Sequence, residues 1–486
     1  MLEFWRRPLH VSWLLAWFAM ALIGGIALSA FAWMPLTISS QAALAAAASL
    51  TVVLVRRTAG AGLVVVMIAA GLILGIWHGH NCRPETAGYK NYIGRTVQLQ
   101  GIVADDVIAE SGSAEIKLRD VRIDQTQLGG SVWVSASTGL HLKRGDQVGF
   151  NGKLRSGFGN YAASMSFVKL SGATRSKHSD PPREIRDAFD AGLERTVPPP
   201  KAALAIGYLT GQHNLVPATL IKQMQVTGLI HLVIAGGYNV TILVRLARRV
   251  CARITKRLAI VAAGGVLLGL TLVAGFVAPM ARTTVVAGLS LAAWYYGRWP
   301  HPMVLLPVAA AITACIDPSF VWGDVGWYMT FIAYGGLIVL GPMLKVWWWG
   351  DRRHGEIKQI IVDTIAVQIV TTPLMAYAFQ QYSVYGLPAN LLVLPFMSLT
   401  MLASVAAGLA GMMLPMALAH WISWPANILL SYTEKVTVWL SGAPGANYGG
   451  SLGFGGLLLS YAAVMLFVWR LKRKTGYDFR SENLIE

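Results

Sequence analysis

Long apolar runs alternate with short polar segments along most of the chain. A transmembrane helix needs about 20 consecutive apolar residues, and runs near that length predict about twelve spans. The two segments that flank Pro415 could be re-entrant rather than spanning, because Pro395 and Pro425 interrupt them. The predicted spans are Val11–Trp33, Thr37–Val55, Ala61–Trp77, Gly228–Val244, Leu258–Val277, Arg282–Tyr296, Met303–Ile316, Gly326–Val346, Ile360–Phe379, Pro388–Met413, Met416–Leu440 and Leu452–Trp469.

The long polar interval after the third span has the pattern of a β-domain. Five short stretches alternate in polarity or are rich in β-branched residues, and turns such as Arg144-Gly145-Asp146 separate them. Five short strands of this kind indicate a small barrel similar to the OB fold. The predicted strands are Thr96–Ala104, Ala114–Asp124, Ser131–Ser135, Gln147–Leu154 and Ser164–Leu170.

These patterns predict a polytopic α-helical membrane protein with an inserted extracytoplasmic OB-like β-barrel domain. After the barrel, Arg183–Arg195 places Ile185, Phe189 and Leu193 four residues apart, which predicts an amphipathic helix at the membrane interface that ends before Pro198. The predicted domains are N-terminal transmembrane helices at 1–77, an OB-like domain at 78–180, interfacial helices at 181–225, a transmembrane channel domain at 226–470 and a cytoplasmic tail at 471–486.

Composition and charge agree with this architecture. Only 13% of the residues are charged, against about 25% in soluble domains, so a water-soluble fold is excluded. The net charge of +17 is largely topological, because Lys and Arg collect in cytoplasmic loops. Basic clusters such as Arg245–Arg257 and Arg470–Lys474 fall in alternate loops, whereas Gln380–Leu387 has no Lys or Arg. We therefore expect a multi-pass protein of the cell (inner) membrane with both termini cytoplasmic and the β-domain outside.

The three cysteines form neither a zinc motif nor a disulfide framework. They are Cys82, Cys251 and Cys315, and they lie far apart in the sequence. One alternative remains open, which is that Cys82 and Cys315 both face outside and pair.

The β-domain carries candidate DNA contacts. Barrels that bind single strands combine a basic groove with exposed aromatic rings that stack on bases. Aromatic candidates include Phe150, Phe158, Tyr161 and Phe167. The alternative is that the aromatic residues form the core and the charges are solvated, and composition alone favours that alternative. The candidate contacts are Lys117, Arg119, Trp133, Lys143, Arg144, Lys153 and Arg155.

Polar residues inside the predicted spans are candidates for a translocation path, because an ionisable group in a span costs about 2.5 to 3.5 kcal/mol to insert. His231 stands near Gly236-Gly237, a pair that weakens the helix and could free backbone carbonyls to line a cavity. The alternative is that each polar group ties one helix to another. The sequence favours a functional role for His231 and leaves both possibilities open for Gln368 and Asn390. The candidate path residues are His231, Gly236, Gly237, Asn239, Arg282, Asp363, Gln368 and Asn390.

No sequence pattern indicates catalysis. The chain has no Gly-x-x-x-x-Gly-Lys-Ser/Thr phosphate loop, no Gly-x-Ser-x-Gly elbow and no His-Glu-x-x-His motif. His78-Gly79-His80 lacks further ligands nearby, so we expect no enzyme activity, metal or cofactor. Two rival functions remain. A small-solute transporter with an external ligand-binding β-domain should show an internal inverted repeat, and a membrane-embedded hydrolase needs a nucleophile–base or metal constellation. The sequence provides neither.

Several short motifs between about residues 200 and 410 occur together in one known family. Leu209-Thr210-Gly211 is followed by Gly228-Leu229-Ile230-His231-Leu232, then by the Arg in Met280–Thr284 and the run from Ala366 to Pro395. In this order they resemble the competence domain of the ComEC family, the inner-membrane channel for DNA uptake in transformation. The resemblance covers residues from about 200 to 410. Asn239 stands where the family usually has a second His, which argues against a role that needs a His pair.

The resemblance implies a channel that carries single-stranded DNA into the cytoplasm during natural transformation. Many members of the family carry a C-terminal metallo-β-lactamase-like domain, and the chain lacks its His-x-His-x-Asp-His motif. Besides single-stranded DNA and membrane lipid, the expected partners are therefore an external DNA receptor, a separate nuclease, and a cytoplasmic motor or single-strand-binding protein. A proton-linked ratchet is an alternative to the motor, and it would depend on Asp363.

Overall fold

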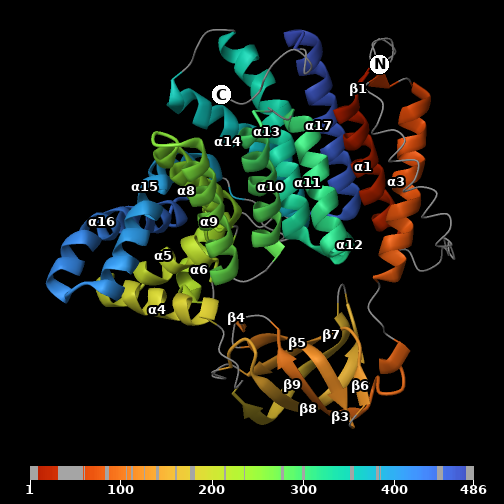
Figure 1. Cartoon of the computed structure of the whole chain (residues 1–486), viewed down its shortest axis with the longest axis vertical. Coiled ribbons are helices and arrows are strands. Elements are labelled where there is room, and N and C mark those ends of the chain that lie inside the picture. The colour runs from red at the N-terminus through yellow and green to blue at the C-terminus, as the bar shows by residue number, and fades with distance from the viewer. Residues whose placement is uncertain are drawn as a thin grey trace. The chain divides into compact units, whose positions relative to one another are not determined.

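The structure is a computed structural model of the chain. It describes residues 9–30, 58–59, 61–82, 87–104, 107–110, 113–124, 126–137, 142–158, 161–175, 181–212, 215–234, 236–274, 278–297, 301–350, 355–378, 383, 385–445 and 452–477. The chain forms two compact units (Figure 1). The first comprises Met1–Ala19, Ile185–Thr313 and Asp324–Glu486, and the second comprises Met20–Glu184 and Ala314–Gly323.

A seven-stranded mixed sheet dominates the second unit. The five predicted strands are all present, each within a few residues of its predicted bounds, and the structure adds the short strands β4 and β6, which the sequence pattern did not indicate. The strands are β3 (Thr96–Val103), β4 (Ile108–Glu110), β5 (Ser113–Ile123), β6 (Thr126–Leu128), β7 (Ser131–Ser137), β8 (Gln147–Ser156) and β9 (Tyr161–Thr174).

The five long strands are paired in a closed order. Strand β3 pairs with both β5 and β8, and the pairings run β3–β8–β9–β7–β5 and return to β3. All are antiparallel except β7–β9, which is parallel. Alternate residues are buried along most of β3, β5 and β7, and Leu99, Ile116, Val134, Phe150 and Met165 form part of the resulting core. This period-two burial is the physical basis of the polarity pattern in the sequence.

Helices and one short 3-10 turn also belong to this unit. The C-terminal half of α1 (Val11–Ser29) crosses α3 (Ala61–Asn81) with the backbones in contact, since a Cβ at Gly75 would lie 2.2 Å from the Leu22 carbonyl oxygen. The indole of Trp322 in α12 (Ser319–Gly323) donates to the Ile26 carbonyl at 3.0 Å. The one-turn 3-10 helix η2 (Ala87–Tyr89) precedes the sheet. Small residues thus allow close helix packing here.

Helices make up the first unit. Helix α4 confirms the amphipathic helix predicted at Arg183–Arg195. The helices are α4 (Pro181–Thr196), α5 (Lys201–Thr210), α6 (Ala218–Val226), α7 (His231–Ile234), α8 (Gly236–Cys251), α9 (Lys256–Ala274), α10 (Ala278–Tyr295), α11 (Pro302–Ile316), α13 (Val325–Trp349), α14 (Glu356–Ala378), α15 (Gly386–Met413), α16 (Met416–Ser441) and α17 (Phe454–Thr475). The short strand β1 (Leu9–His10) also belongs to this unit, whereas β2 (Thr58–Ala59) belongs to the second.

Within the described ranges, six helices are long and apolar enough to cross a membrane. Each coincides with a predicted span, and they indicate a multi-pass membrane protein. They lie at Ser12–Ser29, Gly62–Asn81, Val325–Trp349, Lys358–Ala378, Gly386–Met413 and Phe454–Thr475. Of the other predicted spans, Met303–Ile316 coincides with the shorter apolar helix α11, and three coincide with α9, α10 and α16, which are outside this set. Thr37–Val55 lies outside the described residues.

The predicted span Gly228–Val244 begins in a turn, and the helix that it predicts starts three residues later, at His231. Helix α6 ends at Val226, a turn follows, and α7 and α8 lie on either side of Ala235, which is outside the described residues. Gly228 adopts φ +70°, a left-handed conformation that ends a helix and that glycine tolerates best. Hydropathy does not register such a turn, because the residues on both sides of it are apolar.

Candidate functional site

His231 is held at the start of α7 by the turn that precedes it. Its Nδ1 lies 2.8 Å from the carbonyl oxygen of Gly228. A carbonyl can only accept, so Nδ1 carries the hydrogen and Nε2 is left free to accept or to bind. The left-handed glycine and the histidine three residues later thus form one small structural unit.

Gly228 packs directly against the start of α15. A Cβ at Gly228 would lie 3.1 Å from the Ser383 Cβ and 3.2 Å from the Gly386 Cα. Gly386 in turn faces α14, where a Cβ on it would meet the Gln368 Nε2 at 2.6 Å. The structure therefore connects His231 and Gln368, both predicted path residues, through two closely packed glycines.

Asn390 lies one turn further along α15 and is 9% exposed. Its Oδ1 is buried without a hydrogen-bond partner, and so is the Oγ of Ser383. Leaving such an atom unpaired costs about 1 to 3 kcal/mol, and ordered water usually removes that cost. We call Gly228, His231, Gln368, Ser383, Gly386 and Asn390 the Gly228 cluster.

Of the other path candidates, Gly236, Gly237 and Asn239 lie in the first turn of α8.

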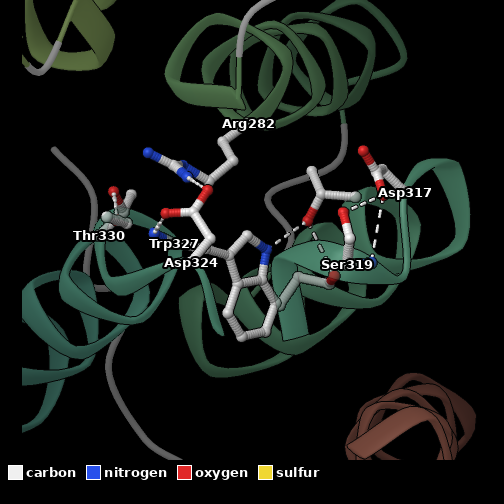
Figure 2. Close-up of polar contacts among 9 residues, drawn as sticks. Arg282, Asp317, Ser319, Asp324, Trp327 and Thr330 are labelled. Carbon is white, nitrogen blue, oxygen red and sulfur yellow. Dashed lines mark hydrogen bonds and ion pairs between the residues drawn. The ribbon is translucent and has the colours of Figure 1, made fainter. Parts of the chain in front are cut away.

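Arg282 belongs to a different group (Figure 2). Its NH1 lies 3.4 Å from Oδ2 of Asp324, and the arginine side chain is 4% exposed. Asp324 is the N-cap of α13, and its Oδ1 accepts from the Trp327 amide at 2.9 Å. The pair ties α10 to the start of α13, which is the structural role that the sequence left as the alternative for such residues. Sequence reasoning missed Asp324, although an Asp directly before an apolar helix is a capping signal.

Asp363 makes its hydrogen bond within α14, accepting from the Gln359 Nε2 at 2.8 Å. It faces α13 at Gly341, where a Cβ would lie 3.6 Å from Oδ1. None of these contacts reaches a residue of the Gly228 cluster. The path candidates therefore fall into four groups, and the contacts through Gly228 and Gly386 link His231 to Gln368, with Asn390 one turn further along α15.

In the β-domain, three of the candidate DNA contacts fall in one row of opposed residues across the sheet, and the fourth member of that row, Ser164, is buried at 6% exposure. Lys117 is opposite Trp133, Trp133 is opposite Ser164, and Ser164 is opposite Arg155. Directly opposed residues share a face, and the neighbouring Ile116, Val134 and Met165 point into the core instead. The row Lys117–Trp133–Ser164–Arg155 therefore crosses β5, β7, β9 and β8.

Two further aromatic rings extend this row. Phe158 packs edge-on against Trp133 with ring centroids 5.5 Å apart, and Tyr161 follows at 5.3 Å from Phe158. Phe158 is 53% exposed, whereas Phe150 is fully buried. The composition-based preference for aromatic residues in the core is thus correct for Phe150 and wrong for Phe158.

The remaining basic candidates lie outside this row. Arg119 is exposed beside Asp120, and Lys153 is opposite Thr96 at the β3 side of β8. Lys143 and Arg144 form the turn before β8, where the Lys143 amide donates to Asp146 Oδ2 and the Arg144 carbonyl accepts from Arg183. Among the residues that the structure describes, no group of three or more His, Cys, Asp or Glu side chains could hold a metal ion.

Comparison with known proteins gives one match. A family model described as Competence protein matches residues 208–474, a stretch that contains the Gly228 cluster, Arg282 and Asp363. No curated protein and no solved structure matches the chain. The matched stretch is more than half of the 486 residues. The chain therefore belongs to the Competence protein family, and this membership implies a role in DNA uptake during natural transformation.

Proposed function

We propose that this protein carries single-stranded DNA across the cell membrane into the cytoplasm, with its β-domain outside and both termini in the cytoplasm. The strand binds first to the β-domain and is then passed to the helical unit. The observation that carries this proposal is the row Lys117–Trp133–Ser164–Arg155, flanked by Phe158 and Tyr161, in a chain of the Competence protein family.

The β-domain is proposed to be an OB-like barrel. Two features support this: the pairings of the five long strands return to β3, and one of them, β7–β9, is parallel in an otherwise antiparallel set. Barrels of this class bind oligonucleotides on the face of their second and third strands and on nearby loops. Lys117 and Trp133 lie on the second and third of the long strands, and Phe158 lies in the connection to the fifth.

This face has the chemistry that a single strand requires. Aromatic rings stack on bases of any sequence, at about 1 to 3 kcal/mol per base, and flanking cations bind the phosphates. Trp133, Phe158 and Tyr161 provide consecutive rings, while Lys117 and Arg155 provide charge at either end. Binding of this kind has little base specificity, which suits uptake of arbitrary DNA.

In the helical unit, the Gly228 cluster is proposed as the closed constriction of the path. A phosphate in dry hydrocarbon is prohibitively costly, so an open path must be wet and polar. The unpaired Oδ1 of Asn390 and Oγ of Ser383 would gain partners if water entered. The close contacts of Gly228 with Gly386 and of Gly386 with Gln368 would separate at the same time. Opening of the constriction would therefore lose packing contacts but give hydrogen-bond partners to buried polar atoms.

We further propose that the chain performs no chemistry on the strand. A separate nuclease would provide single strands, and either a cytoplasmic motor or a proton-linked step would pull them inward. The chain needs no cofactor for this role.

Binding by full-length protein in nanodiscs tests the β-domain step. We expect Trp133→Ala and Phe158→Ala each to weaken binding of a fluorescent oligothymidylate by about 5- to 100-fold, as loss of one stacked base predicts. We expect Arg155→Ala to reduce the dependence of the affinity on salt, because one phosphate contact is lost. Arg122→Ala is the matched control, since it removes an exposed charge of β5 outside the row.

Wild-type affinity in both aromatic variants would exclude this face as the binding surface. Transformation of a deletion strain, complemented with each variant, tests uptake separately. Loss of transformation in the deletion strain and its return with wild-type protein are expected, and normal transformation without the gene would contradict the proposed function as a whole.

A further inference from the structure

Two of the three cysteines meet at one histidine in the second unit. The Nε2 of His78, in the last turn of α3, lies 2.8 Å from the carbonyl oxygen of Cys315. The Sγ of Cys82, one turn further on, lies 3.9 Å from that same nitrogen and 3.9 Å from Nδ1. A thiol at residue 82 and the backbone of residue 315 therefore share one imidazole, although they are far apart in the sequence.

The histidine is also oriented for thiol chemistry. The Cys315 carbonyl can only accept, so the hydrogen lies on Nε2 and a neutral ring has a free lone pair on Nδ1. Nδ1 can then take the proton of the Cys82 thiol. Both cysteines are exposed, so an external reagent can reach them. Partial burial and the nearby Asp317 carboxylate raise the pKa of the Cys82 thiol, so its deprotonation depends on the neighbouring His78.

We propose that Cys82 and Cys315 form an intrachain disulfide that joins the end of α3 to the segment before α12. This inference rests on the proposed topology, in which the β-domain directly after α3 is outside the cell, because disulfides persist in oxidising compartments. Cys251 ends α8 beside the basic cluster Arg245–Arg249, on the side proposed to be cytoplasmic, and remains a thiol. The three cysteines would then be one disulfide on the outer side of the membrane and one free thiol on the cytoplasmic side.

The oxidant required is a protein disulfide of the extracytoplasmic thiol-oxidising system. The Cys82 proton passes to His78, and the Cys82 thiolate attacks one sulfur of that disulfide, which gives a mixed disulfide and releases a thiolate on the oxidant. The Cys315 thiolate then attacks the Cys82 sulfur. The bond between Cys82 and the oxidant breaks, the Cys82–Cys315 bond forms, and the oxidant leaves as a dithiol. Two electrons move from the two cysteines to the oxidant. His78 passes the Cys82 proton to the first oxidant thiolate, and the Cys315 proton goes to the second, so the oxidant carries both protons away.

The disulfide would fix the point at which the chain leaves the membrane for the β-domain. Cys82 follows α3 directly, and the described part of the β-domain starts at Ala87. At the other end, Asp317 accepts from the amide of Ser319 at 3.1 Å and also from its hydroxyl, which holds the turn into α12 (Figure 2). The crosslink would therefore join two segments that are each already ordered by local contacts.

Counting thiols in the full-length protein tests this proposal. Cells are quenched in acid, the protein is denatured, and free thiols are coupled to a maleimide polymer that retards the protein on a gel. We expect one adduct without reduction and three after reduction, because only Cys251 is free. Cys251→Ser should give no adduct without reduction and two adducts after it. Cys82→Ser should give two adducts in both conditions. The double variant Cys82→Ser/Cys315→Ser, with one adduct in both conditions, is the matched control.

Three adducts in wild-type protein without reduction would overturn the disulfide. A reducible dimer that disappears in Cys82→Ser would overturn it as well, since the bond would then join two copies. A membrane-impermeant maleimide applied to reduced spheroplasts checks the topology independently. Labelling of Cys82 and Cys315 but not Cys251 is expected, and labelling of Cys251 alone would overturn the topology and the disulfide together. Neither assay uses DNA, so failure of the disulfide proposal can be distinguished from failure of the proposed DNA transport.

Discussion

Gly228 shows how one residue can impose both a backbone conformation and a close contact. Its φ of +70° is left-handed, and its Cα lies against Gly386 and Ser383. Gly211 has a similar φ of +77°, but a Cβ there would meet nothing within 4 Å. A side chain added at Gly211 would therefore meet only the unfavourable backbone conformation, whereas one added at Gly228 would also collide with neighbouring residues.

We predict that Gly228→Ala destabilises the protein more than Gly211→Ala does. Left-handed backbone costs a non-glycine residue about 1 to 2 kcal/mol, and this applies to both positions. At Gly228 the new methyl also crowds the start of α15, and overpacking adds about 1 to 3 kcal/mol. Thermal unfolding of the detergent-solubilised protein measures the difference. Equal losses in the two variants would mean that the Gly228–Gly386 contact is not close in the folded protein.

Asp190 in α4 is a partly buried acid with one oxygen unpaired. Gln212 donates to its Oδ2 at 2.9 Å, while Oδ1 is buried without a partner. Burial raises the pKa of the Asp190 carboxyl to about 6, and the Gln212 hydrogen bond and Arg186 only partly oppose that rise. The folded protein thus keeps this proton at pH values where the unfolded chain has lost it.

The sign of the stability effect follows from this difference. The unfolded Asp190 titrates near pH 4, so stability falls as pH rises from about 4 to about 6 and stays low above that. We predict that Asp190→Asn stabilises the protein at pH 7 by up to about 2 to 3 kcal/mol and has no stabilising effect at pH 4. Unfolding measured at both pH values checks this. Glu184→Gln, an exposed acid of the same helix, is the control, and an equal gain at pH 4 and pH 7 would contradict the assignment.

At the scale of elements, α4 docks on α15 through glycine. A Cβ at Gly411 would lie 1.9 Å from the Gly192 carbonyl oxygen, and one at Gly192 would lie 2.7 Å from that of Gly408. Arg195 adds a hydrogen bond to the Gly411 carbonyl at 3.2 Å. The amphipathic helix predicted from sequence is thus held by backbone contact with a membrane-type helix.

We predict that Gly411→Ala loosens α4. The obstructing atoms belong to the backbone of Gly192 and cannot rotate away, so we expect a loss of about 1 to 3 kcal/mol. Limited proteolysis at the basic residues of α4 reports the loosening directly. Gly264→Ala in α9 meets nothing within 4 Å and should be neutral or slightly stabilising, because alanine favours helix. Unchanged protection of α4 in Gly411→Ala would contradict the close crossing.

The elements that sequence predicts well are those with local periodicity. Alternating polarity gave the five long strands, and four-residue spacing gave α4. The closed order of the strands depends on pairs such as Leu99 with both Ile123 and Phe150, which no local pattern encodes. The same holds for the site. Trp133 and Arg155 were candidates by residue type, but only register places them in one row. The turn at Gly228 was missed because apolar residues on both sides concealed it.

At the scale of the whole molecule, the direction of transport sets an energetic requirement. Each nucleotide carries a negative charge, and moving it inward against a potential that is negative inside costs about 2.3 kcal/mol per 100 mV. Binding at the β-domain cannot supply this for a long strand, because each bound nucleotide must be released again. Net uptake therefore needs either a cytoplasmic motor or a proton-linked step within the membrane.

Asp363 is the residue on which the proton-linked version depends. It lies in the long apolar helix α14, and its Oδ1 accepts from Gln359. We predict that Asp363→Asn lowers transformation at least tenfold while leaving thermal stability nearly unchanged, because Asn keeps the acceptor and loses only the titrating group. Gln359→Ala removes the hydrogen bond but keeps the acid, and it should lower transformation much less than Asp363→Asn does. Wild-type uptake should also fall when a K⁺/H⁺ exchanger collapses the pH gradient.

The two versions then give opposite results in one pair of measurements. With a proton-linked step, Asp363→Asn and the exchanger act on the same event, so the exchanger has no further effect on the variant. With a cytoplasmic motor, the variant takes up DNA normally, and its uptake responds to the exchanger as the wild type does. Normal uptake in Asp363→Asn would therefore exclude the proton-linked step and leave the motor, since the potential still opposes every phosphate and a passive pore cannot accumulate the strand.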